Sequence, residues 1–325
     1  ALTANTTASY NTAVGSNSLS ANTTGDYNTA VGLNAGLSVT TGTVNTLLGA
    51  NAGDALTVGN SNVALGYLAL SSDTQGDRSV ALGYSALFAQ NFTSSTDNYN
   101  VAVGYNAGAA VTTGINNTLI GGLAGDANTT ASYVTAVGYA SLGANTTGTG
   151  NVALGRHALL TNTTASYNTA AGTNALQSNT TGSSNTAVGR DALAANTTGT
   201  SNVAVGATAL DANTTASNLI AIGNNALGAN TSGANTVAIG TSALAANTTG
   251  VQQVAVGDNA LVANTTGNYN NAIGQGALDA NTTGVNNVGV GAYALSANTT
   301  ASNNTAVGHY SLVANTTGIS NVAVG

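Results

Sequence analysis

The sequence lacks Cys, Pro, Met and Trp altogether, and its 325 residues include only 12 Tyr and 2 Phe. Charge is equally scarce, with three Arg and ten Asp but no Lys and no Glu. Without Cys and with only two His, the chain has no residues for thiol catalysis, disulfides or a zinc centre. Three cations are too few for a surface that binds nucleic acid or an anionic membrane. No apolar run approaches the ~18 residues of a membrane span, so we expect no membrane insertion in this segment.

The chain instead contains a short pattern, N-x-A-x-G, that returns every 17 residues apart from one step of 21. We number each unit from the Asn of this pattern, so that its Gly is position 5. Eighteen full units cover 11–320, with partial units at both ends. We interpret 1–325 as a single repeat solenoid and, since no capping unit is present, as a window of a longer fibrous protein. A structural turn is expected at each position-5 glycine, namely Gly15, Gly32, Gly49, Gly66, Gly83, Gly104, Gly121, Gly138, Gly155, Gly172, Gly189, Gly206, Gly223, Gly240, Gly257, Gly274, Gly291, Gly308 and Gly325.

The length and residue types of the unit predict an all-β fold, because a helical hairpin repeat needs about 34 residues. The β-branched residues favour a parallel β-solenoid, or β-roll, whose 17-residue coils contain two short strands at positions 1–5 and 8–14. Positions 4 and 9, such as Val14 and Leu19, are the predicted apolar core. Small residues at positions 3 and 8 indicate tight contacts inside the coil or with a neighbouring chain. A four-residue insertion in unit 79–99 predicts a bulging loop around Phe88–Phe92.

The most distinctive chemical feature is an Asn-Thr-Thr corner at positions 12–14. One interpretation is a ladder of stacked amides with Thr hydroxyls at the turn. Another is a set of N-glycosylation acceptors, although sugars ~4.8 Å apart would be crowded. A third is an ice-binding threonine face. The replacement of the Asn-Thr-Thr corner by other residues through much of 28–127 argues against this interpretation. The possible glycan acceptors are Asn5, Asn22, Asn128, Asn145, Asn162, Asn179, Asn196, Asn213, Asn230, Asn247, Asn264, Asn281, Asn298 and Asn315.

The tyrosines fall at positions 6 and 17 as well as elsewhere, and Tyr67 and Tyr84 lie on adjacent coils. Their rings are expected to stack, which would stiffen the coil stack or form a small patch for a sugar or a partner. His157 and His309 occupy outer-turn positions typical of surface residues. No residue set in the sequence supports catalysis or a bound cofactor, so the chain is not expected to be an enzyme.

The ten Asp are spread over different unit positions, which favours solvated surface charge. A calcium site needs several oxygens that converge on one point. Asp54 together with Asp73 or Asp77 is the only weak candidate for such a site, and no metal site is predicted.

The segments N-V-A-V-G at 202–206 and 321–325, and N-T-A-V-G at 11–15 and 185–189, resemble the N-S-V-A-I-G motif of trimeric autotransporter adhesin heads. Similar repeats occur in phage tail-fibre proteins. The resemblance covers every unit and implies a left-handed parallel β-roll in which three chains associate along the axis. The 17-residue unit with its Asn-Thr-Thr corner departs from those heads, which have a shorter repeat.

These observations together predict a structural extracellular fibre or stalk segment of a surface adhesin, a filament or a phage tail fibre. Its expected location is the cell surface or a virion. The expected partners are copies of itself, as a homotrimer or an end-to-end filament, with glycans or a host surface as further partners. The alternative function is an ice-binding or carbohydrate-binding β-solenoid that uses stacked Thr and Asn ladders.

Overall fold

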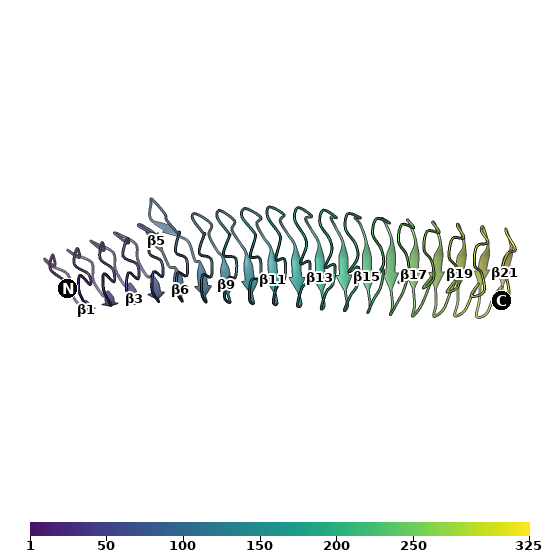
Figure 1. Ribbon diagram of the computed structural model, residues 1–325, viewed down its shortest axis with the longest axis horizontal. Helices are drawn as coiled ribbons and strands as arrows, with labels where there is room; N and C mark the ends of the chain where they lie inside the picture. The colour runs from purple at the N-terminus through teal and green to yellow at the C-terminus, as the bar shows by residue number, and fades with distance from the viewer. The chain divides into compact units, whose positions relative to one another are not determined.

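A computed structural model describes residues 1–325 and contains strands and turns but no helix. The chain divides into two compact units, unit 1 at Ala1–Ser166 and unit 2 at Tyr167–Gly325. Within each unit, successive coils stack so that their strands lie side by side (Figure 1). Each unit is therefore a parallel β-solenoid with one coil per 17-residue repeat, and the predicted fold class is confirmed.

Each coil contributes one strand of three residues at positions 2–4. In unit 1 the strands are β1 (Thr12–Val14), β2 (Thr29–Val31), β3 (Thr46–Leu48), β4 (Val63–Leu65), β6 (Val80–Leu82), β8 (Val101–Val103), β9 (Thr118–Ile120), β10 (Thr135–Val137) and β11 (Val152–Leu154), with two extra strands β5 (Gly76–Asp77) and β7 (Thr96–Asp97). In unit 2 they are β12 (Thr169–Ala171), β13 (Thr186–Val188), β14 (Val203–Val205), β15 (Ile220–Ile222), β16 (Val237–Ile239), β17 (Val254–Val256), β18 (Asn271–Ile273), β19 (Val288–Val290), β20 (Thr305–Val307) and β21 (Val322–Val324).

Equivalent residues of successive coils face each other in the sheet of each unit. Ala187 lies opposite Ala204, for example, and Ala204 lies opposite Ala221. This in-register pairing places the same position of the unit opposite itself at each step along the sheet. Any single position of the 17-residue unit therefore forms a straight row of side chains within a unit.

The predicted second strand at positions 8–14 is wrong, because this part of the coil consists of turns. Positions 7 and 9 adopt left-handed backbone conformations in almost every coil, with φ of 56° at Asn17 and 46° at Leu19. A left-handed residue cannot continue an extended strand. Leucine rarely takes this conformation, so the residue types at position 9 gave no sign of the turn.

Two features of the structure require glycine at position 5. Its φ is positive in all nineteen copies, and at Gly206 it is 135°. A Cβ at Gly206 would also lie 2.4 Å from the carbonyl oxygen of Gly223 in the next coil. Both the backbone conformation and the close stacking of coils therefore exclude a side chain.

The core follows the alternation of the strand. Ala30 at position 3 is fully buried, whereas Val31 at position 4 points outward and is 38% exposed. The small residues at positions 3 and 8 and most of the leucines at position 9 are buried. Position 9 therefore belongs to the core as predicted, but position 4 does not. The small residues at positions 3 and 8 pack inside the coil rather than against a neighbouring chain.

Two coils of unit 1 have a large residue at position 3, where other coils have Ala, and the neighbouring position 9 is then Gly in place of Leu. Position 3 is Leu47 instead of Ala, and position 9 is glycine both in its own coil, at Gly53, and in the preceding one, at Gly36. A Cβ at either glycine would lie 2.8 Å from a Leu47 methyl group. Leu119 has the same relationship to Gly108 and Gly125. One inward leucine therefore fills the space that position-9 leucines occupy elsewhere.

The inserted residues lie later in their coil than predicted. Phe88 to Asn91 keep the regular hydrogen bonds between coils, such as Ser72 N–H to the carbonyl of Phe88 at 3.2 Å, while the Gln75 N–H donates to the carbonyl of Phe92, one residue later than in other coils, at 3.1 Å. The Phe92 side chain is buried, which holds this segment to the core. Residues 93–95 then project as an exposed loop that returns through the pairing of β5 with β7, seen near the β5 label in Figure 1.

Candidate functional site

The Asn-Thr-Thr corner contains an amide ladder inside the coil. The side-chain nitrogen of Asn196 donates to the side-chain oxygen of Asn179 at 2.8 Å, and Asn213 donates to Asn196 at 3.0 Å. The same relationship continues in unit 2 as far as Asn315, and it also joins Asn128, Asn145 and Asn162 in unit 1. Each amide thus bonds to its equivalents on both sides, as in a stacked Asn ladder.

A second amide row lies at position 1, and the two rows meet at one carbonyl in the coils that carry Asn at both position 1 and position 12. Asn185 at position 1 and Asn196 at position 12 both donate to the carbonyl oxygen of Gly199, at 2.8 and 3.0 Å. Two donors use both lone pairs of that inward carbonyl. In these coils the two asparagines tie the beginning of the coil to its end, and the interior has a polar side at positions 1, 12 and 15 and an apolar side at positions 3, 8 and 9.

Burial decides between the two interpretations of these asparagines. Of the fourteen possible glycan acceptors, all but Asn5 and Asn315 are completely buried. A sugar on a buried amide nitrogen would replace one of its two N–H groups, so the bond to the neighbouring amide or the bond to the position-15 carbonyl would be lost. The folded coils accordingly have the geometry of the ladder and no room for glycans at the twelve buried positions.

The two threonines of the corner differ in what their hydroxyls do. The position-13 hydroxyl of Thr197 donates to the carbonyl of Thr214 in the next coil at 3.0 Å, and this bond recurs along the row. The position-14 threonine, such as Thr198, is exposed. Only the outer row is therefore fully available to solvent.

The outward face of the parallel sheet is apolar. In unit 2, positions 2 and 4 of β12–β21 carry only Val, Ile, Thr, Ala and one Asn, without a single charged residue. We call these outward side chains the strand ribbon. Ile222 and Ile273 in its interior are 38% and 44% exposed. The sequence signal for this surface was the T/V-A-V alternation, which had instead been interpreted as placing position 4 in the core.

The coil that precedes the insertion in unit 1 carries a buried carboxylate at the position of the ladder asparagine. Asp73 takes the place of the ladder asparagine and accepts hydrogen bonds from the Gln90 side chain at 2.7 Å and from the Phe92 N–H at 3.1 Å. Burial raises the pKa of Asp73 above its ordinary value of 3.8, although these hydrogen bonds oppose the shift. Beside this group, the buried side-chain nitrogen of Asn98 has no partner.

The three aspartates considered for calcium do not converge. Asp54 accepts a hydrogen bond from Ser71 at 2.7 Å, while Asp77 accepts from the Asn60 backbone at 2.6 Å and from Ser95 at 2.6 Å. No group of three or more potential metal-ligating side chains occurs in the structure. These carboxylates bind protein donors, and two of them tie neighbouring coils or the inserted loop in place.

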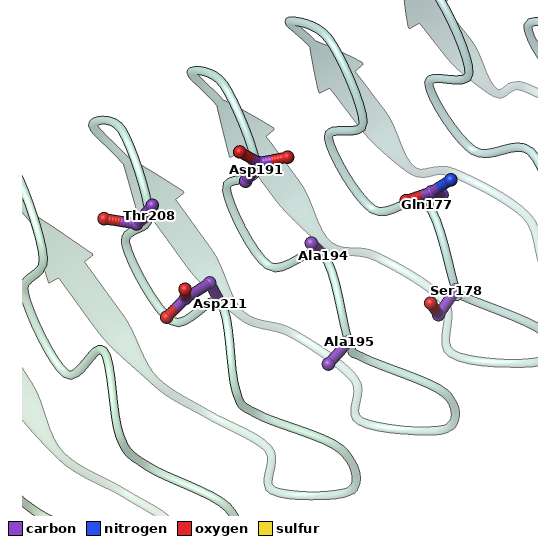
Figure 2. Close-up of a pocket in the computed structure, with 7 residues that line it drawn as sticks. All are labelled: Gln177, Ser178, Asp191, Ala194, Ala195, Thr208 and Asp211. Carbon is purple, nitrogen blue, oxygen red and sulfur yellow. The ribbon is translucent and has the colours of Figure 1, made fainter.

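A shallow depression crosses three coils of unit 2 (Figure 2). Asp191 at its rim accepts from Asn174 at 2.9 Å and pairs with Arg190 at 2.5 Å. Burial, together with the nearby charge of Asp191, raises the pKa of Asp211 against the effect of backbone hydrogen bonds. The two carboxylates lie apart around a floor of alanines, so they do not form a general acid–base pair. The lining residues are Gln177, Ser178, Asp191, Ala194, Ala195, Thr208 and Asp211.

The tyrosines form stacked pairs on adjacent coils. Tyr67 and Tyr84, for which stacking is predicted, have ring centroids 5.5 Å apart but are tilted by 31°, whereas Tyr105 stacks on Tyr84 at 5.3 Å. The most parallel pairs are Tyr10 with Tyr27 at 4.9 Å and Tyr293 with Tyr310 at 5.4 Å, both with interplanar angles of 10°. Stacked rings turn their faces toward each other, which leaves ring edges rather than faces for a sugar.

The two histidines lie beside tyrosines at the outer turn. His157 packs near Tyr139 with centroids 5.8 Å apart, and His309 lies against Tyr310. Neither histidine has a carboxylate partner in a salt bridge. Their positions agree with the surface location that the sequence predicts.

Comparison with protein-family models and with curated proteins found no match for this chain. No helix in the structure could cross a membrane. The fold and its surfaces define the chain as a parallel β-solenoid repeat protein with a polar amide interior and an apolar outer sheet face.

Proposed function

We propose that this chain is a structural segment of an extracellular fibre whose copies associate through the strand ribbon. The observation that carries the proposal is the uncharged, exposed sheet face, which runs through consecutive strands in each unit. Monomeric proteins rarely leave a contiguous apolar patch of this kind uncovered. In this proposal the asparagine ladder stiffens the coils. No cofactor and no catalytic role is assigned to the chain.

The occupant that fits the ribbon best is a second copy of the chain. In unit 2 alone the ribbon runs through the consecutive strands β12–β21, a longer surface than the few residues of a single coil could offer to a partner. A flat face without charge or polar side chains other than Thr and Asn offers little to a charged partner, whereas an identical face matches it row for row. The resemblance to trimeric adhesin heads and phage tail fibres supports three copies and a location on a cell surface or virion.

The proposed interface is tested by substitutions that introduce a charged residue into the strand ribbon. Val205→Asp and Ile239→Asp, both at position 4 of unit 2, are expected to reduce assemblies to single chains, because association would bury an unpaired carboxylate. Val262→Asp is the matched control, since Asp already occupies this outer position at Asp211 and Asp279. Sedimentation velocity reports the assembly and circular dichroism reports the fold. Unchanged assembly in both ribbon variants would refute the proposed interface.

Ice binding is the second candidate, supported by the exposed position-14 row, which continues from Thr181 to Thr317 in unit 2 with Ser232 as its only substitution. Against it, the position-13 hydroxyls donate to backbone carbonyls, and the row is broken in unit 1 at Val58 and Gln75. A thermal-hysteresis measurement separates the two functions, because a structural segment is expected to show none.

A further inference from the structure

The geometry points to the stacked tyrosine pairs as sites of oxidative cross-linking, with Tyr10 and Tyr27 as the principal pair. Their rings are 4.9 Å apart and nearly parallel. They are also among the most exposed large side chains of the molecule, at 76% and 59%. A second such pair is Tyr84 with Tyr105, at 5.3 Å. The product would be a carbon–carbon dityrosine bond that covalently joins two adjacent coils.

The composition directs oxidation to these rings. Cysteine and methionine are the usual targets of oxidants in proteins, and this chain contains neither of them and no tryptophan. The 12 tyrosines are therefore the principal side chains that a one-electron oxidant can attack. Their phenols reach solvent, so a large oxidant such as a haem peroxidase can approach them.

The reaction balances with hydrogen peroxide as the terminal oxidant. Peroxidase removes one electron and one proton from each phenol, and the two phenoxyl radicals join through the ring carbons beside their oxygens. The hydrogen on each of those carbons then moves to the phenol oxygen and restores both hydroxyls. The pair has lost two hydrogen atoms in total, and one hydrogen peroxide takes them up to give two waters.

Stacking decides which tyrosines react with each other. A radical on Tyr27 has Tyr10 as a fixed neighbour, so their coupling is intramolecular. Tyr269 is similarly exposed, at 52%, but stacks on no other ring, and it can couple only with another molecule. At micromolar protein, we expect coupling of Tyr10 with Tyr27 to exceed coupling of Tyr269 by at least about tenfold, because neighbours in one molecule reach about millimolar or higher effective concentrations.

The experiment treats the full chain with a haem peroxidase and hydrogen peroxide, and then cleaves it on the N-terminal side of Asp. This cleavage separates Tyr10 in peptide 1–25 from Tyr27 in peptide 26–53, and leaves Tyr269 alone in peptide 258–278. Mass spectrometry is expected to show 1–25 joined to 26–53, lighter by two hydrogen atoms, in a yield independent of protein concentration. Tyr27→Phe should remove this product, whereas Tyr269→Phe should leave it unchanged.

Two results would overturn the inference. One is oxidation of Tyr10 and Tyr27 without any joined peptide. The other is a product that includes peptide 258–278 as often as it joins 1–25 to 26–53, because coupling would then follow exposure and not stacking. Retention of the joined product in Tyr27→Phe would equally contradict the assignment.

Discussion

The side-chain amide of Asn196 donates to that of Asn179 at 2.8 Å, and both side chains are completely buried. Replacement of Asn196 by Ala removes this bond and the bond to the Gly199 carbonyl, and it leaves the Asn213 amide without its acceptor in the ladder. A buried polar group without a partner costs about 1–3 kcal/mol. We therefore expect Asn196→Ala to lower the urea midpoint clearly.

The matched control for the ladder is Thr198→Ala, in the same corner but at the exposed position. It should change the urea midpoint little, because surface substitutions usually fall within about 0.5 kcal/mol. Equal shifts in the two variants would show that the amide ladder does not stabilise the coil.

Adjacent glycines provide a test of the position-5 turn. Gly121 has φ of 134°, and a Cβ there would lie 2.6 Å from the Gly138 carbonyl oxygen. At Gly122 the nearest atom to a Cβ is on the Tyr139 ring at 3.7 Å, an ordinary contact. Gly121→Ala should lose roughly 1–3 kcal/mol or more from strain alone, whereas Gly122→Ala should be neutral or slightly stabilising. The melting temperatures of the two variants are compared by thermal denaturation. Similar melting temperatures would contradict the requirement for glycine at position 5.

The exchange of large and small core residues predicts coupling between Leu47 and Gly53. Leu47→Ala should cost about 2–5 kcal/mol through a cavity, and Gly53→Ala should cost about 1–3 kcal/mol because its Cβ approaches a Leu47 methyl group. In the double variant the new methyl group occupies part of the cavity, so the combined cost should fall below the sum by about 0.5–3 kcal/mol.

Leu119→Ala provides the control for this double-mutant cycle, because Leu119 packs against Gly108 and Gly125 and not against Gly53. Its cost should simply add to that of Gly53→Ala. Additivity in the Leu47 cycle as well would mean that the two residues do not share one space.

Much of this molecule could be predicted from the sequence, since a 17-residue period with a single four-residue insertion dictates one coil per repeat and the invariant glycine marks its turn. Which residues of the strand face the core could not be predicted so simply. Val14 is larger and more apolar than Ala13, so residue type alone predicts Val14 in the core. The structure shows that the inner side of this strand carries alanine in most coils, opposite a leucine at position 9, and that the valines turn outward.

The candidate surfaces were harder to predict for a related reason. The asparagine of the corner is buried because its amide bonds to equivalents one coil away; the repeat predicts this ladder, but the local Asn-Thr-Thr pattern alone fits a glycan acceptor equally well. The partnership of Leu47 with Gly36 and Gly53 was present in the sequence as three coincident exceptions to the repeat. Its meaning depends on the register that places adjacent coils in contact.

The buried carboxylate at Asp73 predicts an unusual dependence on pH. Because burial raises its pKa in the folded state above 3.8, the folded chain holds a proton that the unfolded chain releases between these two values. The contribution of this group to stability therefore falls as pH rises through that interval. Asp73→Asn should raise the melting temperature at pH 7 and have much less effect at pH 3. A lower melting temperature for the variant at pH 7 would show that the carboxylate is needed for its hydrogen bonds to Gln90 and Phe92.

The association of copies through the strand ribbon is tested most directly by the native mass of the unmodified chain, measured by sedimentation equilibrium over a wide range of concentrations. The account predicts a discrete multiple of the 31.2 kDa chain, with three copies at 93.6 kDa as the arrangement that the adhesin-like motif implies. A mass of 31.2 kDa at every concentration would contradict it, because the apolar sheet face would then be stable in water without a second copy.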